Sequence, residues 1–121
     1  MPYVDGFVLP MAKKHLALYK RIARKAGKIW QELGALEYHE CVGDDLDIKG
    51  GMPVVPFPKL AKAKKGETVV FSWIVYSSRK HRDSVNAKVM KDPRIAKLMA
   101  SGMPFDMKRM AYGGFKTIVD Y

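Results

Sequence analysis

Residues 67–76 carry apolar side chains at both odd and even positions, which makes them the most informative segment of the chain. In the run ETVVFSWIVY, Ser72 is the only polar residue after the first two positions. Successive side chains of a strand point to opposite faces of its sheet, so both faces of this sheet are expected to be buried. The helices that the rest of the chain predicts suffice for one face, so we expect a second copy of the chain to cover the other.

Three further strands are predicted from shorter runs, over residues 3–9, 35–42 and 109–119. Pro10 is expected to end the first strand, because proline cannot donate to the hydrogen-bond ladder. The pair Gly113-Gly114 inside the last strand predicts a bulge or a close approach of another group to the backbone.

Apolar residues at three- and four-residue spacing predict a long helix over residues 12–33. Ser77 or Ser78 can cap a second helix that runs through Met90, and Asp92 with Pro93 starts a short one. Residues 44–66 are rich in glycine, proline and lysine, and are predicted to form a long irregular connection.

The predicted order is strand, helix, strand, strand, helix, strand. This βαββαβ order is typical of the ferredoxin-like α+β fold, in which helices cover one face of a four-stranded antiparallel sheet. We expect residues 1–121 to form one such domain, and the sheets of two domains to pack face to face.

Composition narrows the class of protein. The chain has 121 residues, 48% of them hydrophobic, which is typical of a folded globular domain rather than a disordered or fibrous one. One cysteine excludes an internal disulfide and multi-cysteine metal sites. No apolar run reaches the roughly 20 residues of a membrane helix, and the first residues lack signal-peptide features. We therefore expect a cytoplasmic protein without membrane contact.

The formal net charge of +10 is the unusual bulk property. It favours anionic ligands or polyanions as partners, although the same lysines can simply be solvated. The basic residues are densest over residues 13–28 and 59–65. No zinc finger, helix-turn-helix or RNA-binding sheet signature is present, so nucleic acid is a possible partner that the sequence does not favour.

A cluster of cations at the start of the second helix is the sharpest local signal. Arg79, Lys80 and Arg82 fall in its first turn, where the helix dipole disfavours positive charge. A bound phosphate or carboxylate would resolve this conflict. Alternatively, the side chains extend into water or pair with acidic residues.

A set of aromatic and methionine residues can either build the core or line a ligand cleft. Its members are Tyr38, Trp73, Phe105, Tyr112, Phe115, Met99, Met103, Met107 and Met110. Four polar residues could converge on such a cleft, namely His81, Asn86, Asp106 and Arg109. The predicted binding residues are therefore Tyr38, Trp73, Arg79, His81, Arg82, Asn86, Phe105, Asp106 and Arg109.

Two other clusters favour structural interpretations. His39 and Cys41 share a strand face, but a nucleophilic thiol needs an oriented base, so a buried apolar cysteine is expected. The acidic residues near Asp44 lack the alternation of a calcium loop, so we expect an acidic turn and no metal site. No cofactor is expected.

Motifs along nearly the whole chain resemble one family. They are YVDGF (3–7), GALEY (34–38), ECVGDD (40–45), VFSW (70–73), HRD (81–83), DP (92–93), MPFD (103–106), RM (109–110) and YGGF (112–115). They are similar to the bacterial YbaA-like family of domains of unknown function, within the dimeric α/β-barrel superfamily. The resemblance implies a barrel-forming homodimer and supplies no activity. More distant relatives in the superfamily include cofactor-free oxygenases and isomerases, which bind ligands in a cleft between sheet and helices.

Three hypotheses follow from the sequence. The leading one is a protein that binds, or also modifies, a small aromatic or anionic molecule in that cleft. If it is an enzyme, cofactor-independent chemistry is expected, with His81 or Asp106 moving the proton and Arg79 or Arg82 holding an anion. The alternatives are a basic accessory protein that binds a polyanion and a structural dimer without ligand.

Overall fold

The computed structural model describes all 121 residues. Its main elements are β1 (Tyr3–Ala12), α1 (Leu16–Glu32), β2 (Glu37–Val42), β3 (Glu67–Tyr76), α3 (Arg79–Lys91), α4 (Pro93–Ala100) and β4 (Ala111–Lys116). Short helical turns are η1 (Lys13–His15), α2 (Phe57–Leu60) and η2 (Met107–Arg109). No helix is both long enough and apolar enough to cross a membrane.

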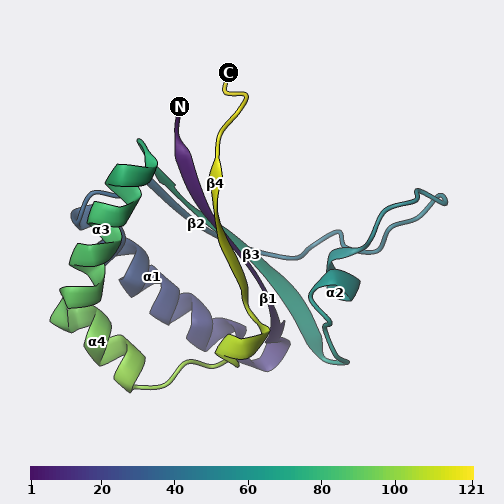
Figure 1. The fold of residues 1–121 in the computed structure, drawn as a ribbon. Helices are drawn as coiled ribbons and strands as arrows, with labels where there is room; N and C mark the ends of the chain where they lie inside the picture. Colours follow the sequence, from purple (N-terminus) through teal and green to yellow (C-terminus); the bar gives the residue numbers. More distant parts are fainter.

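The four strands form one antiparallel sheet in the order β2-β3-β1-β4. The long helices α1, α3 and α4 lie on the same side of this sheet (Figure 1). The strand order and the one-sided helices confirm the predicted ferredoxin-like α+β fold.

The core lies between the sheet and the helices. On β3 every second side chain from Val70 to Tyr76 is at most 4% exposed. Val85 and Val89 of α3 and Ile29 of α1 are buried against them. Burial of this face of β3 is therefore explained within one chain.

The other sheet face has no long helix over it and is contacted only by the short α2 near Phe71, and we call it the open face. Its apolar side chains are Val4, Val8, Phe71, Trp73, Val75 and Phe115. The register brings them together, since Val4 lies between Val75 and Phe115, and Val8 is opposite Phe71. Phe71 is 43% exposed. Cover by a second copy of the chain stays a prediction.

The predicted end of the first strand at Pro10 is wrong, because β1 continues to Ala12. Pairing with β4 stops at Val8, so the far end of β1 is a sheet edge on that side, where a missing N–H is tolerated. The last strand is shorter than predicted and ends at Lys116. The first long helix begins at Leu16 rather than residue 12, after the η1 turn.

Gly114 explains the glycine pair of the last strand. The register of β4 against β1 runs without interruption, so there is no bulge. The hydroxyl of Tyr3 occupies the space where a Cβ on residue 114 would lie. The close-approach alternative is therefore the observed one.

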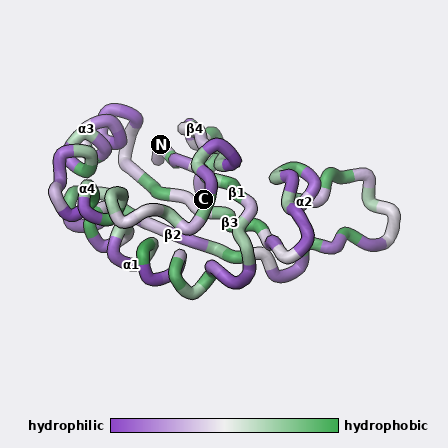
Figure 2. The backbone as a smooth tube through the Cα atoms, turned by 90° about the horizontal axis from the view of Figure 1, so that it is seen from below, coloured by the Kyte–Doolittle hydropathy of each residue, from purple (hydrophilic) through white to green (hydrophobic).

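Residues 44–66 leave the body of the molecule as an arm whose only regular element is α2 (Figure 1). Its turn is at Gly50-Gly51, and hydropathy colouring shows apolar stretches along it (Figure 2). Phe57 at its base packs edge-on to Phe71 with ring centroids 5.9 Å apart. The arm thus joins the open face at one end and carries exposed apolar residues, including Met52 and Val55.

Candidate functional site

A cleft of about 410 Å³ lies between the sheet and the helices. Its lining is mainly apolar and unusually rich in methionine. The residues that supply this character are Met90, Met99, Met103, Met107, Met110 and Phe105. Methionine side chains are flexible and polarizable, so they adapt to the shape of a bound molecule.

Helix caps set the path of the chain over this cleft. The Ser78 hydroxyl accepts a hydrogen bond from the His81 amide at 3.0 Å, and Asp92 accepts one from the Arg94 amide at 2.8 Å. Asp106 then caps η2 by accepting from the Lys108 amide at 2.9 Å. These caps fix where α3 and α4 start and how residues 101–110 return to the sheet.

A buried ion pair lies at one wall of the cleft, which its Asp5 member lines. Arg82 Nη1 donates to Asp5 Oδ1 at 2.9 Å and to the Tyr112 hydroxyl at 2.8 Å. The Asp5 side chain is 2% exposed and that of Arg82 is 13% exposed. Burial raises the pKa of Asp5, while the charge of Arg82 and a hydrogen bond from Asn86 oppose that rise. Arg82 therefore offsets part of the cost of burying the Asp5 carboxyl.

Asn86 extends this network. Its amide nitrogen is 3.4 Å from Asp5 Oδ2. Its carbonyl oxygen accepts from the Tyr76 hydroxyl at 3.1 Å and from Trp30 Nε1 at 3.3 Å. The Asn86 amide thus has hydrogen-bond donors at its oxygen and an acceptor at its nitrogen, and together these partners fix its orientation at the cleft wall.

Ser72 is a different kind of polar group in the cleft. It is 4% exposed and lines the cleft from the centre of β3. In the register it lies between Phe7 of β1 and Glu40 of β2. None of the side-chain hydrogen bonds of the structure uses its hydroxyl, so it is available to a bound molecule.

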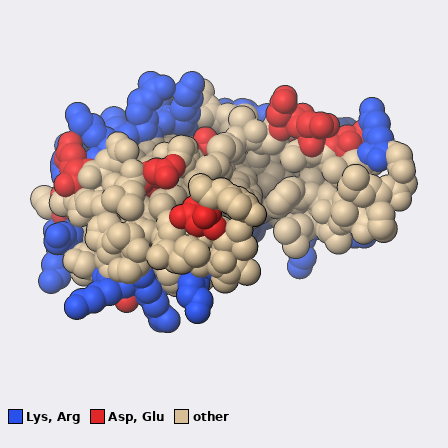
Figure 3. All heavy atoms as spheres, turned by 90° about the horizontal axis from the view of Figure 1, so that it is seen from above, with Lys and Arg blue, Asp and Glu red and all other residues tan.

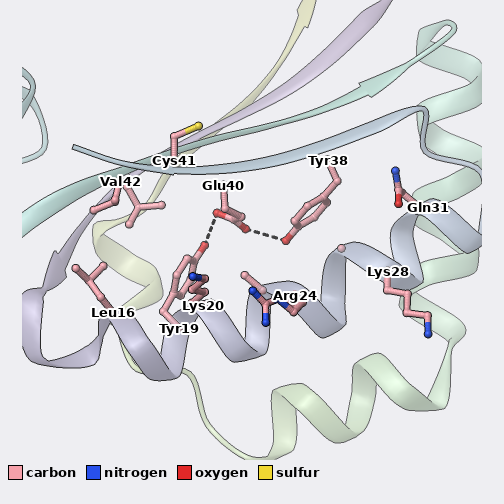
Figure 4. Close-up of a pocket in the computed structure, with 13 residues that line it drawn as sticks. Leu16, Tyr19, Lys20, Arg24, Lys28, Gln31, Tyr38, Glu40, Cys41 and Val42 are labelled. Carbon is pink, nitrogen blue, oxygen red and sulfur yellow. Dashed lines mark hydrogen bonds between the residues drawn. The ribbon is translucent and has the colours of Figure 1, made fainter. Parts of the chain in front are cut away.

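Glu40 lies at the junction of the cleft with a second hollow. The hydroxyls of Tyr19 and Tyr38 donate to its two carboxylate oxygens, each at 2.7 Å (Figure 4). Burial is the main cause that raises the pKa of both tyrosines, and the Glu40 charge raises it further. Both phenols are therefore fixed as neutral donors.

The second hollow is a groove of about 540 Å³ between α1 and β2. Lys20, Arg24 and Lys28 lie along its α1 side (Figure 4). Gly27 lets the Tyr38 ring approach α1, because a Cβ at this position would be 2.6 Å from a ring carbon.

Several predicted residues meet in the cleft. Tyr38, Asn86 and Phe105 line it, as do Tyr112 and the four predicted methionines. Arg82 is not free at the helix start, because it pairs with Asp5 and lies 2.9 Å from Asp83 Oδ1. Arg82 thus already has two acidic partners within the chain.

The other predicted residues lie elsewhere. Trp73 is on the open face, where His39 stacks on it at a centroid distance of 4.7 Å. Arg79 is exposed, and His81 Nδ1 accepts from the Ser77 amide at 3.0 Å. Arg109 pairs with Glu67 at 2.7 Å, at the base of the arm. Asp106 serves as the η2 cap described above.

Sequence reasoning missed Asp5, Ser72 and the tyrosine-bound Glu40 as cleft residues. Asp5 and Ser72 share a face with apolar strand residues that point to the core, so each is a polar residue at a core position. That pattern was the available signal, because buried polar groups usually have a partner or a role.

The cysteine expectation also needs correction. Cys41 is exposed in the chain, on the sheet face that no helix covers. Its neighbour His39 has an orienting group, since Glu37 Oε1 is 2.9 Å from His39 Nε2. No three His, Cys, Asp or Glu side chains lie together in an arrangement that could hold a metal ion.

Comparison with known proteins matches residues 2–107 to the family "Protein of unknown function (DUF1428)". The chain belongs to this family. Among curated members, it is 45% identical to the "Uncharacterized protein YbaA" of Escherichia coli (strain K12), over 99% of both chains. It is equally similar to YbaA of Shigella flexneri. Membership in the DUF1428 family confirms the resemblance read from the sequence motifs.

A comparison of folds adds one solved structure. The "De novo designed protein Foldit4" aligns with a TM-score of 0.50 over 97% of this chain and 99% of its own, at 9% identity. This likeness concerns the fold alone. The DUF1428 chain and the designed protein share an α+β arrangement, and at 9% identity the comparison says nothing about site residues.

Proposed function

We propose that this protein binds a small, mainly apolar molecule in the sheet–helix cleft, and that it does so as a homodimer. The observation that carries the proposal is a cleft of about 410 Å³ where close packing is the rule. Ligand sites usually measure about 300–1,000 Å³, with apolar walls and a few placed polar groups. This cleft has both features.

The lining selects the part of the ligand that enters the cleft. Methionine and aromatic walls suit a planar or flexible hydrocarbon body. The ionisable groups at the cleft wall, Asp5 and Glu40, already have hydrogen-bond donors of their own. The free hydroxyl of Ser72 suits one neutral polar group. An uncharged body, aromatic or aliphatic, is therefore the best fit inside the cleft.

Neither His81 nor Asp106 lines the cleft. The two residues expected to move a proton are used instead to anchor the start of α3 and the η2 turn. We therefore propose binding and assign no reaction to the cleft.

Basic side chains give no single surface for a polyanion on the face seen in Figure 3. Lys and Arg lie there in several separate groups around the helical end, with acidic and uncharged surface between them. A continuous basic track is what non-specific phosphate contact requires. On this face, the distribution of charge does not favour the polyanion alternative.

The homodimer is supported by the open face. Its side chains are apolar across three strands, and the arm with its own exposed apolar residues begins beside it. A contiguous exposed apolar surface usually marks an interface. A second copy offers the same surface, so two open faces can cover each other about a two-fold axis.

The cleft can be tested by filling it. Ala26 of α1 lines the cleft, so Ala26→Leu should reduce binding of the fluorescent apolar probe N-phenyl-1-naphthylamine at least tenfold. The control is Ala96→Leu, which makes the same change on an exposed site of α4 outside the cleft. Leucine suits a helix, and here it fills an existing space, so the thermal midpoint should not fall. Equal probe binding by both variants would contradict the proposal.

A further inference from the structure

The cleft and the groove are neighbouring hollows that meet at one set of side chains. They share four lining residues, Tyr19, Ala23, Tyr38 and Glu40. Tyr19 and Tyr38 are held on Glu40 from the two sides, one from α1 and one from β2 (Figure 4). Ala23, at 7% exposed, is the smallest side chain at this junction.

The two hollows differ in chemistry. The cleft is lined with methionine and aromatic groups, whereas the groove has three cations along one side of α1. Lys20, Arg24 and Lys28 are four residues apart, so they project in one row. None of them forms an ion pair in the structure.

Glu40 offsets only one charge of this row, because it brings a single carboxylate against three cations. Its carboxylate oxygens are both engaged by tyrosine hydroxyls at 2.7 Å. The groove therefore keeps a surplus of positive charge next to an apolar cleft. The row of cations on α1 is the unpaired positive charge that lies next to the cleft.

We propose that the groove holds the carboxylate of an amphipathic ligand whose hydrocarbon body occupies the cleft. This inference rests on the proposed function, and it names the ligand class as a carboxylic acid with an extended apolar body. Arg24 and Lys28 bind the carboxylate at the groove, and the methionine walls surround the body. In this proposal the ligand crosses the junction beside the phenols of Tyr19 and Tyr38.

A matched pair of probes separates the two ends of the site. Decanoate and decanol have the same hydrocarbon body and differ in the carboxylate. Each is measured by its displacement of N-phenyl-1-naphthylamine from the purified protein. We expect decanoate to bind about tenfold more tightly than decanol at low salt, and this preference to shrink as salt screens the cations.

A matched pair of variants then locates the carboxylate. Arg24→Gln with Lys28→Gln removes two cations that line the groove, and Arg21→Gln with Lys25→Gln removes two on the same helix that line neither hollow. Both double variants lose the same charge. We expect the first to weaken decanoate binding about fivefold, as two exposed ion pairs allow, and to leave decanol binding unchanged. The second should leave both unchanged.

Each outcome decides one point. Equal effects of the two double variants on decanoate would overturn the groove as the carboxylate site, while decanol binding would still support the cleft. A decanoate affinity no better than that of decanol would overturn the ligand class in the same way. Failure of the neutral probe and decanol to bind would instead overturn the proposed function, and the inference with it.

Discussion

Replacing Arg82 by methionine should destabilise this protein far more than any change to its exposed arginines. Methionine retains much of the apolar length of the side chain and removes the charge. Arg82→Met removes the donor 2.9 Å from Asp5 and the donors to Tyr112 and Tyr3. The Asp5 carboxylate would remain in place without a cationic partner, with the Asn86 amide at 3.4 Å and the hydroxyls of Tyr112 and Tyr76 as its neutral donors.

The magnitude follows from the burial of the pair. The two side chains are 2% and 13% exposed, so solvent cannot replace the lost partner without opening the interface. Breaking a buried ion pair from one side costs about 3–5 kcal/mol. The whole stability of a domain is about 5–15 kcal/mol. With a urea m-value of about 2 kcal/mol/M, the unfolding midpoint should fall by about 2 M.

The assay is urea unfolding at one fixed protein concentration, since dimerisation would otherwise shift the midpoint. Arg79→Met is the control, because Arg79 is exposed at the start of the same helix. It should change the free energy of unfolding by less than about 0.5 kcal/mol. Asp5→Leu combined with Arg82→Met should recover most of the loss, because an apolar pair often replaces a buried ion pair without cost.

The pH dependence of stability gives an independent check on the role of the Asp5 charge. Burial already raises the pKa of Asp5 above its ordinary value of 3.8, and without Arg82 it should rise further. The folded state then binds a proton more readily than the unfolded chain, so the variant gains stability as the pH falls toward about 4. The deficit of Arg82→Met should therefore shrink in acid. A loss below about 1 kcal/mol at neutral pH, or a double variant as unstable as Arg82→Met, would refute the reasoning.

Two further predictions concern the arm and the open face. The side-chain hydrogen bond from Arg109, together with one from the Lys64 amide, lowers the pKa of Glu67 from 4.5 to about 2. The stability that ionised Glu67 contributes is therefore complete above pH 4.5 and is lost as the pH falls from 4.5 to about 2. Urea midpoints from pH 6 to 2.5 should fall more steeply for the wild type than for Glu67→Gln, and parallel curves would contradict this. Phe71→Glu should convert a sedimenting dimer to single chains, whereas Leu18→Glu, at a similar 41% exposure on α1, should not; a wild type of single-chain mass would reject the dimer.

Much of the fold follows from local patterns. The apolar run of β3, the three- and four-residue spacing of α1 and the caps Ser78 and Asp92 each predict an element that the structure contains. The end of β1 could not be predicted in this way. Whether Pro10 can stay in a strand depends on where the distant strand β4 stops, which is a property of the sheet rather than of the local sequence.

The candidate site was only partly predictable for the same reason. Methionine and aromatic residues predict an adaptable apolar surface, and the structure brings most of them to the cleft. The destination of Arg82 depends on Asp5, which is 77 positions away in the chain. The contrast between paired Arg82 and unpaired Arg24 arises because α1 packs beside the edge strand β2, while α3 packs over the centre of the sheet.

The two chain ends meet because β1 and β4 are neighbours and the Thr117 amide donates to the Pro2 carbonyl at 3.2 Å (Figure 1). A short linker could therefore join them, and new ends could be opened at the Gly50-Gly51 turn, where no other atoms come within 4 Å of a Cβ. Such a circular permutant would keep every strand pairing while reversing the order in which the two halves of the sheet emerge during synthesis. The architecture is thus independent of where translation starts.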